Sequence, residues 1–580
     1  MKKYINIICV VFAICALTSC SDFFSPTTDD EFDAAAGYSS NTEMYTGFLG
    51  IITKVQSVGD KEILLTETRG ELIEPADEST SELISLYNYD TNLQGNSYAD
   101  PRGYYEVVIA CNDYLDKMKS YRENPNVDTE AWRSLVSSAV RIKVWAYKTM
   151  AEIYGKAVWF DDPVTEVTNL HDERFQLLEL PQLVDRCLSL LEQGYAGVKS
   201  NLVINWHAWL DPSTALANSQ YRKWNYMVPA YAGLFAELSL WKGAVMDAAG
   251  QDAITYYQNA ADTLLIALGA QINVTSDPGS NVYWLPSAAT PGHYRPIWDY
   301  NQPYYFETVS AIIYDYQYNQ TNTLLHHFSN EYPNNYWLRP SQAGMDRFLD
   351  SEYNPGASTN DTRYGCCFGE NKGQKYFSKF RHVGSSYRPQ AFYDDCHIYF
   401  YRATQYHMML CEALNHLRRF NAMNAVLNTG VKSGTTEDCF QAGTAEWKGF
   451  ESTIDPTKSD WTGDANFGTR RYPSMGIRGC FGTLVARPVK TNVTELGGEK
   501  PTFRFNDLAL LDEAMLEFAG EGKVYPMMNR MAVRYQDPSI VADRVCRKYT
   551  NTALASTVRS RIMEGDYWVP FDLYNDYFFN

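Results

Sequence analysis

The apolar residues of this chain repeat with the spacing of an α-helix in several separate stretches, and this spacing constrains the fold more than any other feature. In the first clear stretch, one helical face carries Tyr104, Val108, Cys111 and Leu115. Asp100 and Pro101 precede it. An aspartate can cap the first free amides of a helix, and proline fits the first helical position. We therefore expect a helix to begin at this point.

The same spacing returns further along the chain. It marks Val140, Val144, Tyr147, Ala151 and Tyr154 before Gly155; two helices within 225–269 that break near Gly250; Tyr406, Leu410, Ala413 and Leu417; and Leu508, Leu511, Met515 and Phe518 before Gly520 and Gly522. The pattern predicts an all-α fold in which helices pair as tetratricopeptide-like hairpins and stack into a superhelical scaffold. The consensus of about 34 residues is not cleanly present, so we expect degenerate repeats.

Two long irregular stretches interrupt the helical pattern. Residues 276–306 contain five prolines, which rule out a long helix, and many aromatic residues, which argue against disorder. Residues 430–505 are rich in Gly, Thr and Asp. Loops of this length are usually functional or disordered. The aromatic stretch therefore offers Trp284, Trp298, Tyr300 and Tyr304 as candidate ligand contacts, although the same rings could instead hold the loop on the scaffold.

The amino terminus has the pattern of a secretory signal. Lys2 and Lys3 precede an apolar run of about a dozen residues, which is too short to span a bilayer. The sequence "LTSC" that follows resembles a bacterial lipobox, which implies cleavage before Cys20 and lipidation of that cysteine. The alternative is an ordinary signal peptide in which Cys20 is incidental. We expect a lipoprotein signal at 1–19, an acidic tether at 20–33 and the main domain at 34–580.

Charge and cysteine content narrow the function classes. The formal net charge is −19, so the surface should repel nucleic acid and anionic lipid but leave neutral ligands such as sugars open. Beyond the three cysteines of the amino-terminal segment, nine remain, which is ordinary usage and not a disulfide scaffold. We find no nucleotide-binding, metalloprotease or serine-hydrolase motif and expect no cofactor.

Five segments in order resemble the SusD/RagB family of outer-membrane lipoproteins from Bacteroidetes. They are "YYEVVIACNDYL" (104–115), "AVRIKVWAYKTMAEIYGKAVWFDDPV" (139–164), "RPSQAGMDRFLD" with "DTRY" (339–350 and 361–364), "IYFYRATQYHMMLCEALN" (398–415) and "LLDEAMLEFAGEGKVYPMMNR" (510–530). Arg402 and Glu412 hold the family spacing in the fourth, as do Glu517, Glu521, Gly522 and Arg530 in the fifth. Cys411 and Val524–Tyr525–Pro526 depart from the family pattern, which marks a divergent member.

The resemblance implies a helical fold with four tetratricopeptide-like pairs and a ligand site carried by irregular segments. It also implies a lipid-anchored, outward-facing protein of the outer membrane that captures oligosaccharide or polysaccharide. The expected partner is a SusC-like TonB-dependent transporter, and no catalysis is expected. A sugar ring offers C–H groups to an aromatic plane, while its hydroxyls need polar partners.

The resemblance also points to a second ligand-contacting segment, "SLYNYDTNLQGN", with Tyr87, Tyr89 and Asn96 as candidates. Trp206 and Trp209 are a further possibility. Two alternatives to glycan capture stay open. Some relatives import peptides, and a surface glycoside hydrolase would need two carboxylates about 5 to 9.5 Å apart.

Other polar residues are expected to be structural. We expect Arg402 and Glu412 to form a buried pair that orients helices, and "EFAGEG" to end a helix. Adjacent His326 and His327 would point to different faces, so we expect a solvated or capping role and no metal. Asp460, Asp464 and Asn466 have a calcium-like spacing but lack the other positions of an EF-hand loop.

Overall fold

The structure is a computed structural model that describes residue 38 and residues 40–122, 128–164, 174–194, 226–274, 307–315, 318–351, 361–380, 396–429, 476–480, 484–565 and 567–570. The first half of the chain forms α2 (Asn41–Gln56), α3 (Gly59–Arg69), α4 (Ser81–Tyr87), α5 (Arg102–Tyr121), α6 (Thr129–Tyr154), α7 (Leu180–Gln193), α10 (Tyr231–Ala248) and α11 (Ile254–Val274). The second half forms α13 (Leu324–Phe328), α14 (Gln342–Leu349), α15 (Tyr364–Cys367), α16 (Ala403–His416), α17 (Phe420–Asn424), α19 (Glu499–Glu517), α20 (Val524–Tyr535), α21 (Ser539–Val545) and α22 (Thr552–Met563).

The described strands are short and pair only as two-stranded antiparallel ribbons. They are β1 (Ile73–Pro75) with β5 (Leu338–Pro340), β2 (Lys156–Trp159) with β3 (Gln176–Glu179), β4 (Thr308–Ile312) with β8 (Ile398–Arg402), and β6 (Phe368–Asn371) with β7 (Gln374–Phe377). The β1–β5 and β4–β8 ribbons join segments that are far apart in the sequence, and the β2–β3 ribbon pairs strands on either side of one connection. These three ribbons therefore hold segments between the helices in place. The predicted all-α class is confirmed.

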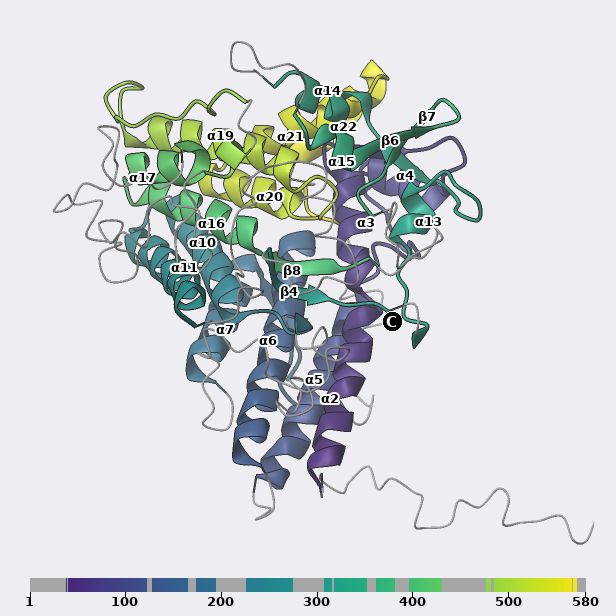
Figure 1. The fold of residues 1–580 in the computed structure, drawn as a ribbon, viewed down its shortest axis with the longest axis vertical. Coiled ribbons are helices and arrows are strands. Elements are labelled where there is room, and N and C mark those ends of the chain that lie inside the picture. Colours follow the sequence, from purple (N-terminus) through teal and green to yellow (C-terminus); the bar gives the residue numbers. More distant parts are fainter. Residues whose placement is uncertain are drawn as a thin grey trace, which may run out of the picture.

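Consecutive helices pack against each other as hairpins and then stack (Figure 1). The pairs are α5 with α6, α10 with α11, α19 with α20 and α21 with α22, while α11 packs on α16 and α10 packs on α20. The long helices α2, α5 and α6 lie side by side at one end of the molecule. Within the described residues, no helix has the length and apolar character needed to cross a membrane.

The local signals place most helix ends correctly. Gly155 ends α6 with a φ of +71°, and Gly250 lies at +68° in the turn between α10 and α11, a conformation that favours glycine. The expected cap is shifted by one residue: Pro101 is the N-cap and α5 begins at Arg102, while the side chain of Asp100 accepts a hydrogen bond from the amide of Arg102 at 2.9 Å. The predicted irregular stretch 430–505 is too long at its end, because α19 begins at Glu499. Pro501 lies in the first turn of α19, where its missing amide costs nothing.

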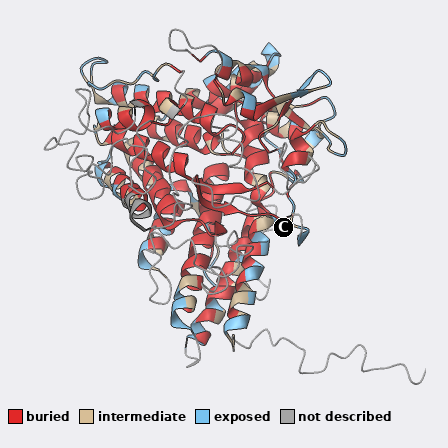
Figure 2. Cartoon of the chain, viewed as in Figure 1, coloured by how far each residue is buried: buried red, intermediate tan, exposed pale blue. Residues whose placement is uncertain are grey.

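The predicted helical faces form the core, which runs through the centre of the molecule (Figure 2). The interior also contains many charged groups. Arg402, which is fully buried, donates to Glu521 at 2.8 Å and to Glu517 at 2.9 Å, and lies 3.4 Å from Glu307. Lys379 also contacts Glu521, at 2.5 Å. These ion pairs connect β8 with the end of α19 and the turn that follows it.

The prediction that Arg402 and Glu412 form a pair with each other is wrong. Glu412 is fully buried, but it accepts from Arg530 at 2.6 Å and from Arg534 at 2.6 Å. Arg402 ends β8 and caps α16, whereas Glu412 lies more than two turns further along that helix. The two side chains therefore join separate ion-pair clusters, both of which reach the α19–α20 hairpin.

Replacing Arg402 by methionine should lower the free energy of unfolding by about 3 kcal/mol or more, because it leaves buried carboxylates without their cation. Arg133, which is exposed and pairs with Glu130 on α6, provides the matched control, and Arg133→Met should cost less than about 1 kcal/mol. Urea unfolding followed by circular dichroism measures both. Equal small losses for the two variants would contradict a stabilising role for the buried cluster.

Candidate functional site

Most of the aromatic candidates cannot be placed. Cys20, Trp206, Trp209, Trp284, Trp298, Tyr300 and Tyr304 lie outside the described residues, as does the calcium-like segment 460–468. The described candidates are Tyr87, Tyr89 and Asn96, which the structure places on and just after α4. They differ sharply in exposure.

Tyr89 and Asn96 hold their own segment in place. Tyr89 is 1% exposed, its hydroxyl donates to the carbonyl of Arg69 at 2.5 Å, and the Arg69 guanidinium covers its ring at 3.7 Å. Asn96 is 6% exposed and donates to the carbonyl of Glu82 at 2.9 Å, while its own oxygen accepts from the amides of Tyr98 and Ala99. Neither side chain offers a surface to a ligand in this conformation.

Tyr87 is half-buried and reaches the surface at the end of α4. One side of its ring packs on Tyr549, with ring centroids 4.6 Å apart, and the Lys548 ammonium lies 4.7 Å from the ring centre. Burial and the neighbouring Glu74 raise the pKa of the Tyr87 hydroxyl. Since α4 packs on β1, Tyr87 at the end of α4 lies near the β1–β5 ribbon.

The β1–β5 ribbon presents a charged group beside these rings. Glu74 and Arg339 are opposite each other in the antiparallel register, and Arg339 donates to Glu74 at 2.9 Å and to Asp77 at 3.1 Å. Tyr336 is half-buried on the same side. Burial has the strongest effect on its hydroxyl and raises the pKa, Arg339 lowers that pKa, and Asp77 raises it. A guanidinium and two carboxylates thus lie close to two tyrosine rings.

Next to this group, Tyr98 and Trp337 contact a shared histidine. Both are half-buried, and the ring of His327 lies edge-on between them, 5.6 Å from Tyr98 and 5.1 Å from Trp337. We call the patch formed by Glu74, Tyr87, Tyr98, Tyr336, Trp337 and Arg339 the α4–α13 surface. The helices and strands that carry it lie together at one side of the molecule (Figure 1).

The expectation for the histidine pair is wrong for His327, which is buried at 3% exposure and is neither solvated nor part of a charged cap. It lies in the last turn of α13, where Nδ1 is 2.7 Å from the carbonyl of Thr323 and Nε2 is 2.8 Å from the hydroxyl of Tyr98. The side chain is buried because it fills the contact between α13, β5 and the loop at Tyr98. The described residues contain no cluster of His, Cys, Asp and Glu suited to a metal ion.

A neighbouring loop presents an exposed aromatic ring. Tyr332 is 95% exposed, while the loop around it is fixed to the β6–β7 ribbon. Asn330 donates to the carbonyl of Asn371 at 3.0 Å, and the hydroxyl of Tyr336 donates to the carbonyl of Lys375. Sequence reasoning missed this loop, although the aromatic density of "YPNNYW" (332–337) was a usable signal.

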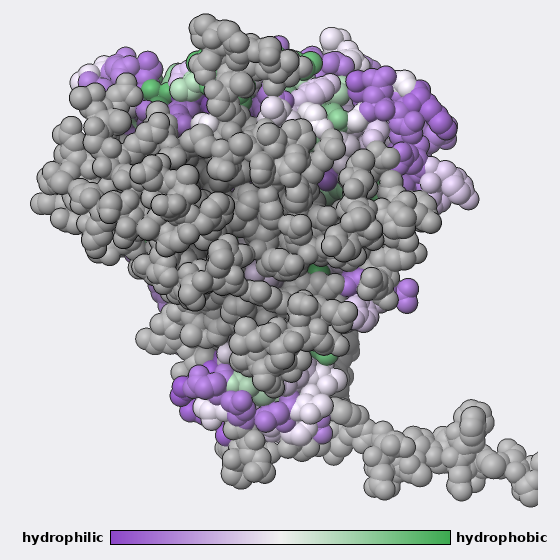
Figure 3. All heavy atoms as spheres, viewed as in Figure 1, coloured by the Kyte–Doolittle hydropathy of each residue, from purple (hydrophilic) through white to green (hydrophobic). Residues whose placement is uncertain are grey.

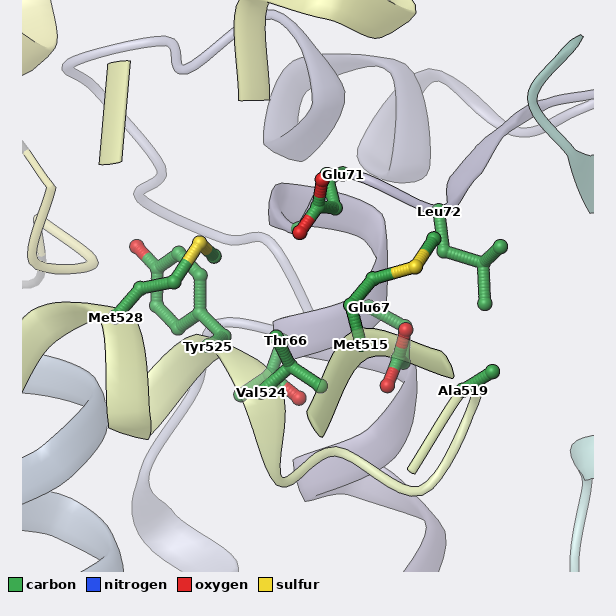
Figure 4. Close-up of a pocket in the computed structure, with 10 residues that line it drawn as sticks. Thr66, Glu67, Glu71, Leu72, Met515, Ala519, Val524, Tyr525 and Met528 are labelled. Carbon is green, nitrogen blue, oxygen red and sulfur yellow. The ribbon is translucent and has the colours of Figure 1, made fainter. Parts of the chain in front are cut away.

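One cavity among the described residues is too small to be a ligand site. The cavity in Figure 4 lies between α3 and the α19–α20 hairpin, has about 10 Å³ open to water, and is lined by residues that include Glu67, Met515 and Tyr525. That is room for roughly one water molecule. Burial raises the pKa of Glu67 to about 7 there. Glu67 accepts from the amide of Gly522, so this place in the core is structural.

The α4–α13 surface combines the two features that a sugar requires. Half-exposed rings can stack against the C–H face of a sugar, and the Arg339–Glu74–Asp77 group can both donate to and accept from hydroxyls. Hydrophilic residues dominate the neighbouring described surface at the upper right of Figure 3, which suits a polar ligand.

Comparison with known proteins identifies the fold. No family model matches the chain, and no curated protein matches it. Among solved structures, it is similar to a SusD superfamily protein from Bacteroides vulgatus, with 12% identity, a TM-score of 0.56 and coverage of 92% of this chain and 96% of that one. It is also similar to a laminarin-binding SusD-like protein (11% identity, TM-score 0.52, coverage 89% and 96%) and to surface glycan-binding protein A from Bacteroides fluxus (12%, 0.53, 89% and 92%).

These matches extend over nearly the whole length of both partners, so the likeness is one of complete architecture and not of a shared helix hairpin. The chain has the SusD fold.

Proposed function

We propose that this protein is a SusD-like binding lipoprotein that captures an oligosaccharide or polysaccharide at the cell surface. The observation that carries the proposal is the α4–α13 surface, where tyrosine and tryptophan rings lie beside the Arg339–Glu74–Asp77 group on a SusD scaffold. Two of the three structures compared above are described as binding laminarin or glycan, which supports a glycan as the ligand class.

The location and partner form the second part of the proposal. Cys20 carries the lipid anchor after removal of residues 1–19, and the anchored protein faces outward from the outer membrane. Captured glycan then passes to a SusC-like TonB-dependent transporter. The support is the lipobox-like "LTSC" and the shared fold. The protein binds its cargo without chemical change, and the acidic net charge of −19 disfavours nucleic acid as cargo.

A peptide is the second candidate cargo. The Arg339–Glu74–Asp77 group could hold peptide amides as well as hydroxyls, since both donate and accept hydrogen bonds. Partly buried aromatic rings at the surface favour sugar, because one face of a sugar ring offers apolar C–H groups that stack on an aromatic plane.

Arg339→Met should weaken binding of the purified protein to its glycan at least tenfold, or about 1.4 kcal/mol, because it removes the donor at the centre of the surface. Retention on a panel of immobilised polysaccharides and peptides first identifies the cargo, and isothermal titration then measures the affinity. Arg133→Met at the far end of α6 is the control and should leave binding unchanged. Unchanged binding in Arg339→Met, with the fold intact by circular dichroism, would place the site elsewhere.

Tyr332→Ala should reduce glycan affinity several-fold, whereas Tyr332→Phe should keep most of it, since stacking needs the ring and not the hydroxyl. Phe505→Ala is the matched control, because it removes an exposed ring from α19, which is far from this loop in the sequence. The same titration compares the three variants. Equal weakening by Tyr332→Ala and Phe505→Ala would contradict a specific role for Tyr332.

The aromatic stretch 276–306 provides a separate test. Loss of retention on the selected glycan in Trp284→Ala or Trp298→Ala, without loss of helical circular dichroism, would place the site in this stretch instead of the α4–α13 surface. Retention unchanged in both variants would leave the α4–α13 surface as the site. Retention on peptides alone would overturn glycan capture in favour of the peptide alternative.

A further inference from the structure

His327 joins the two halves of the α4–α13 surface. One half follows β1 and α4 and ends at Tyr98, and the other follows α13 and leads through the loop to Trp337 and Arg339. The two halves are separated by more than 200 residues of sequence. The histidine is 3% exposed and contacts a ring from each half edge-on.

The hydrogen bonds of His327 define its protonation state. Nδ1 lies 2.7 Å from the Thr323 carbonyl, which can only accept, so Nδ1 carries the hydrogen. In the neutral ring Nε2 is then an acceptor, and the Tyr98 hydroxyl at 2.8 Å donates to it. Two directed hydrogen bonds thus run from Tyr98, in the segment after α4, through His327 to the carbonyl of Thr323 at the start of α13.

The groups around these hydrogen bonds favour the neutral histidine. Burial is the largest influence and lowers the pKa of His327 below its usual value, and the neighbouring His326 lowers it further. The Thr323 carbonyl and Asp60 raise the pKa of His327. However, the Asp60 carboxylate already accepts hydrogen bonds from the amide and the hydroxyl of Thr323. Near Tyr98, burial first and then Glu82 and Asp60 raise the pKa of its hydroxyl to about 12, so Tyr98 keeps its proton.

We propose that His327 is a positioning residue that locks the two halves of the α4–α13 surface together, and that its protonation at Nε2 releases them and weakens glycan binding. This inference rests on the proposed function for its link to binding, but the lock itself does not. A proton on Nε2 places two donors, N–H and O–H, against each other. The Tyr98 hydroxyl must then turn its hydrogen away from Nε2 and lose this acceptor, or the contact breaks.

The sign of the pH effect follows from the neutral native histidine. Below the usual histidine pKa of about 6.5, the unlocked state takes up a proton more readily than the locked one. The contact that holds the two halves together is therefore fully present above a pH of about 6.5, and it is lost as the pH falls through the lower pKa of His327 in the folded state. His327→Gln should remove this dependence, because a glutamine amide does not titrate.

Ring-nitrogen NMR of the purified protein tests the lock directly. We expect the Nδ1–H tautomer at pH 7.5 and a titration midpoint for His327 below 6.5. We also expect the hydrogen-exchange protection factors of the amides of 96–99 and 326–337 to fall at least fivefold between pH 7 and 5, after correction for intrinsic exchange. His326→Gln, the adjacent control, should keep that loss, and His327→Gln should not show it. The Nε2–H tautomer, a midpoint at or above 6.5, or protection independent of pH would overturn the proposal.

Binding provides the second arm, with laminarin as the soluble probe and the polysaccharide panel beside it. Affinity for the retained glycan should fall between pH 7 and 5 in the natural sequence and in His326→Gln, but not in His327→Gln. If His327→Gln does not fold, the titration midpoint of His327, measured by NMR in the natural protein, still tests the proposal. Absence of glycan binding at every pH, with the NMR and exchange results as expected, would overturn the proposed function and leave the lock standing.

Discussion

The structure depends on charged groups that are buried in its centre and satisfied by one another. Arg363, fully buried, contacts Asp361, Glu513 and Glu517, and Glu517 also accepts from Arg402. Removing such charges from water is costly, so the fold tolerates them only when each reaches its partners. The requirement is geometric as well as energetic. To pair these groups, β8, α19 and the segment before α15 must pack against one another.

The same principle extends to the α4–α13 surface. The turn after α4 is held from the other end of the chain, since Arg561 on α22 donates to the carbonyls of Asn88 and Tyr89 at 2.9 Å. Tyr549 donates to the carbonyl of Tyr87 at 2.5 Å. The surface therefore does not stand on a free loop. A rigid support lowers the conformational entropy that is lost when a ligand binds.

Sequence reasoning performed well for helices and poorly for partners. The apolar spacing of residues 104–115 and 140–154 predicted α5 and α6, because helix formation and a buried face are local properties. The motif residues Arg402, Glu412, Glu517, Glu521 and Arg530 all proved to be buried ion-pair residues. Their pairing was predicted incorrectly: Arg402 and Glu412, which hold the family spacing in one motif, were expected to pair with each other, whereas each pairs with residues more than 90 positions away.

The sequence by itself determined the helical class, the helix ends at Gly155 and Gly250, and the acidic charge that disfavours nucleic acid. Only the tertiary structure decided that Tyr87 reaches the surface while Tyr89 is buried, and that His327 connects Tyr98 with Trp337. The physical reason is range. Periodicity and capping act over a few residues, whereas exposure and hydrogen-bond partnership depend on segments hundreds of residues apart, which only the packed fold brings together.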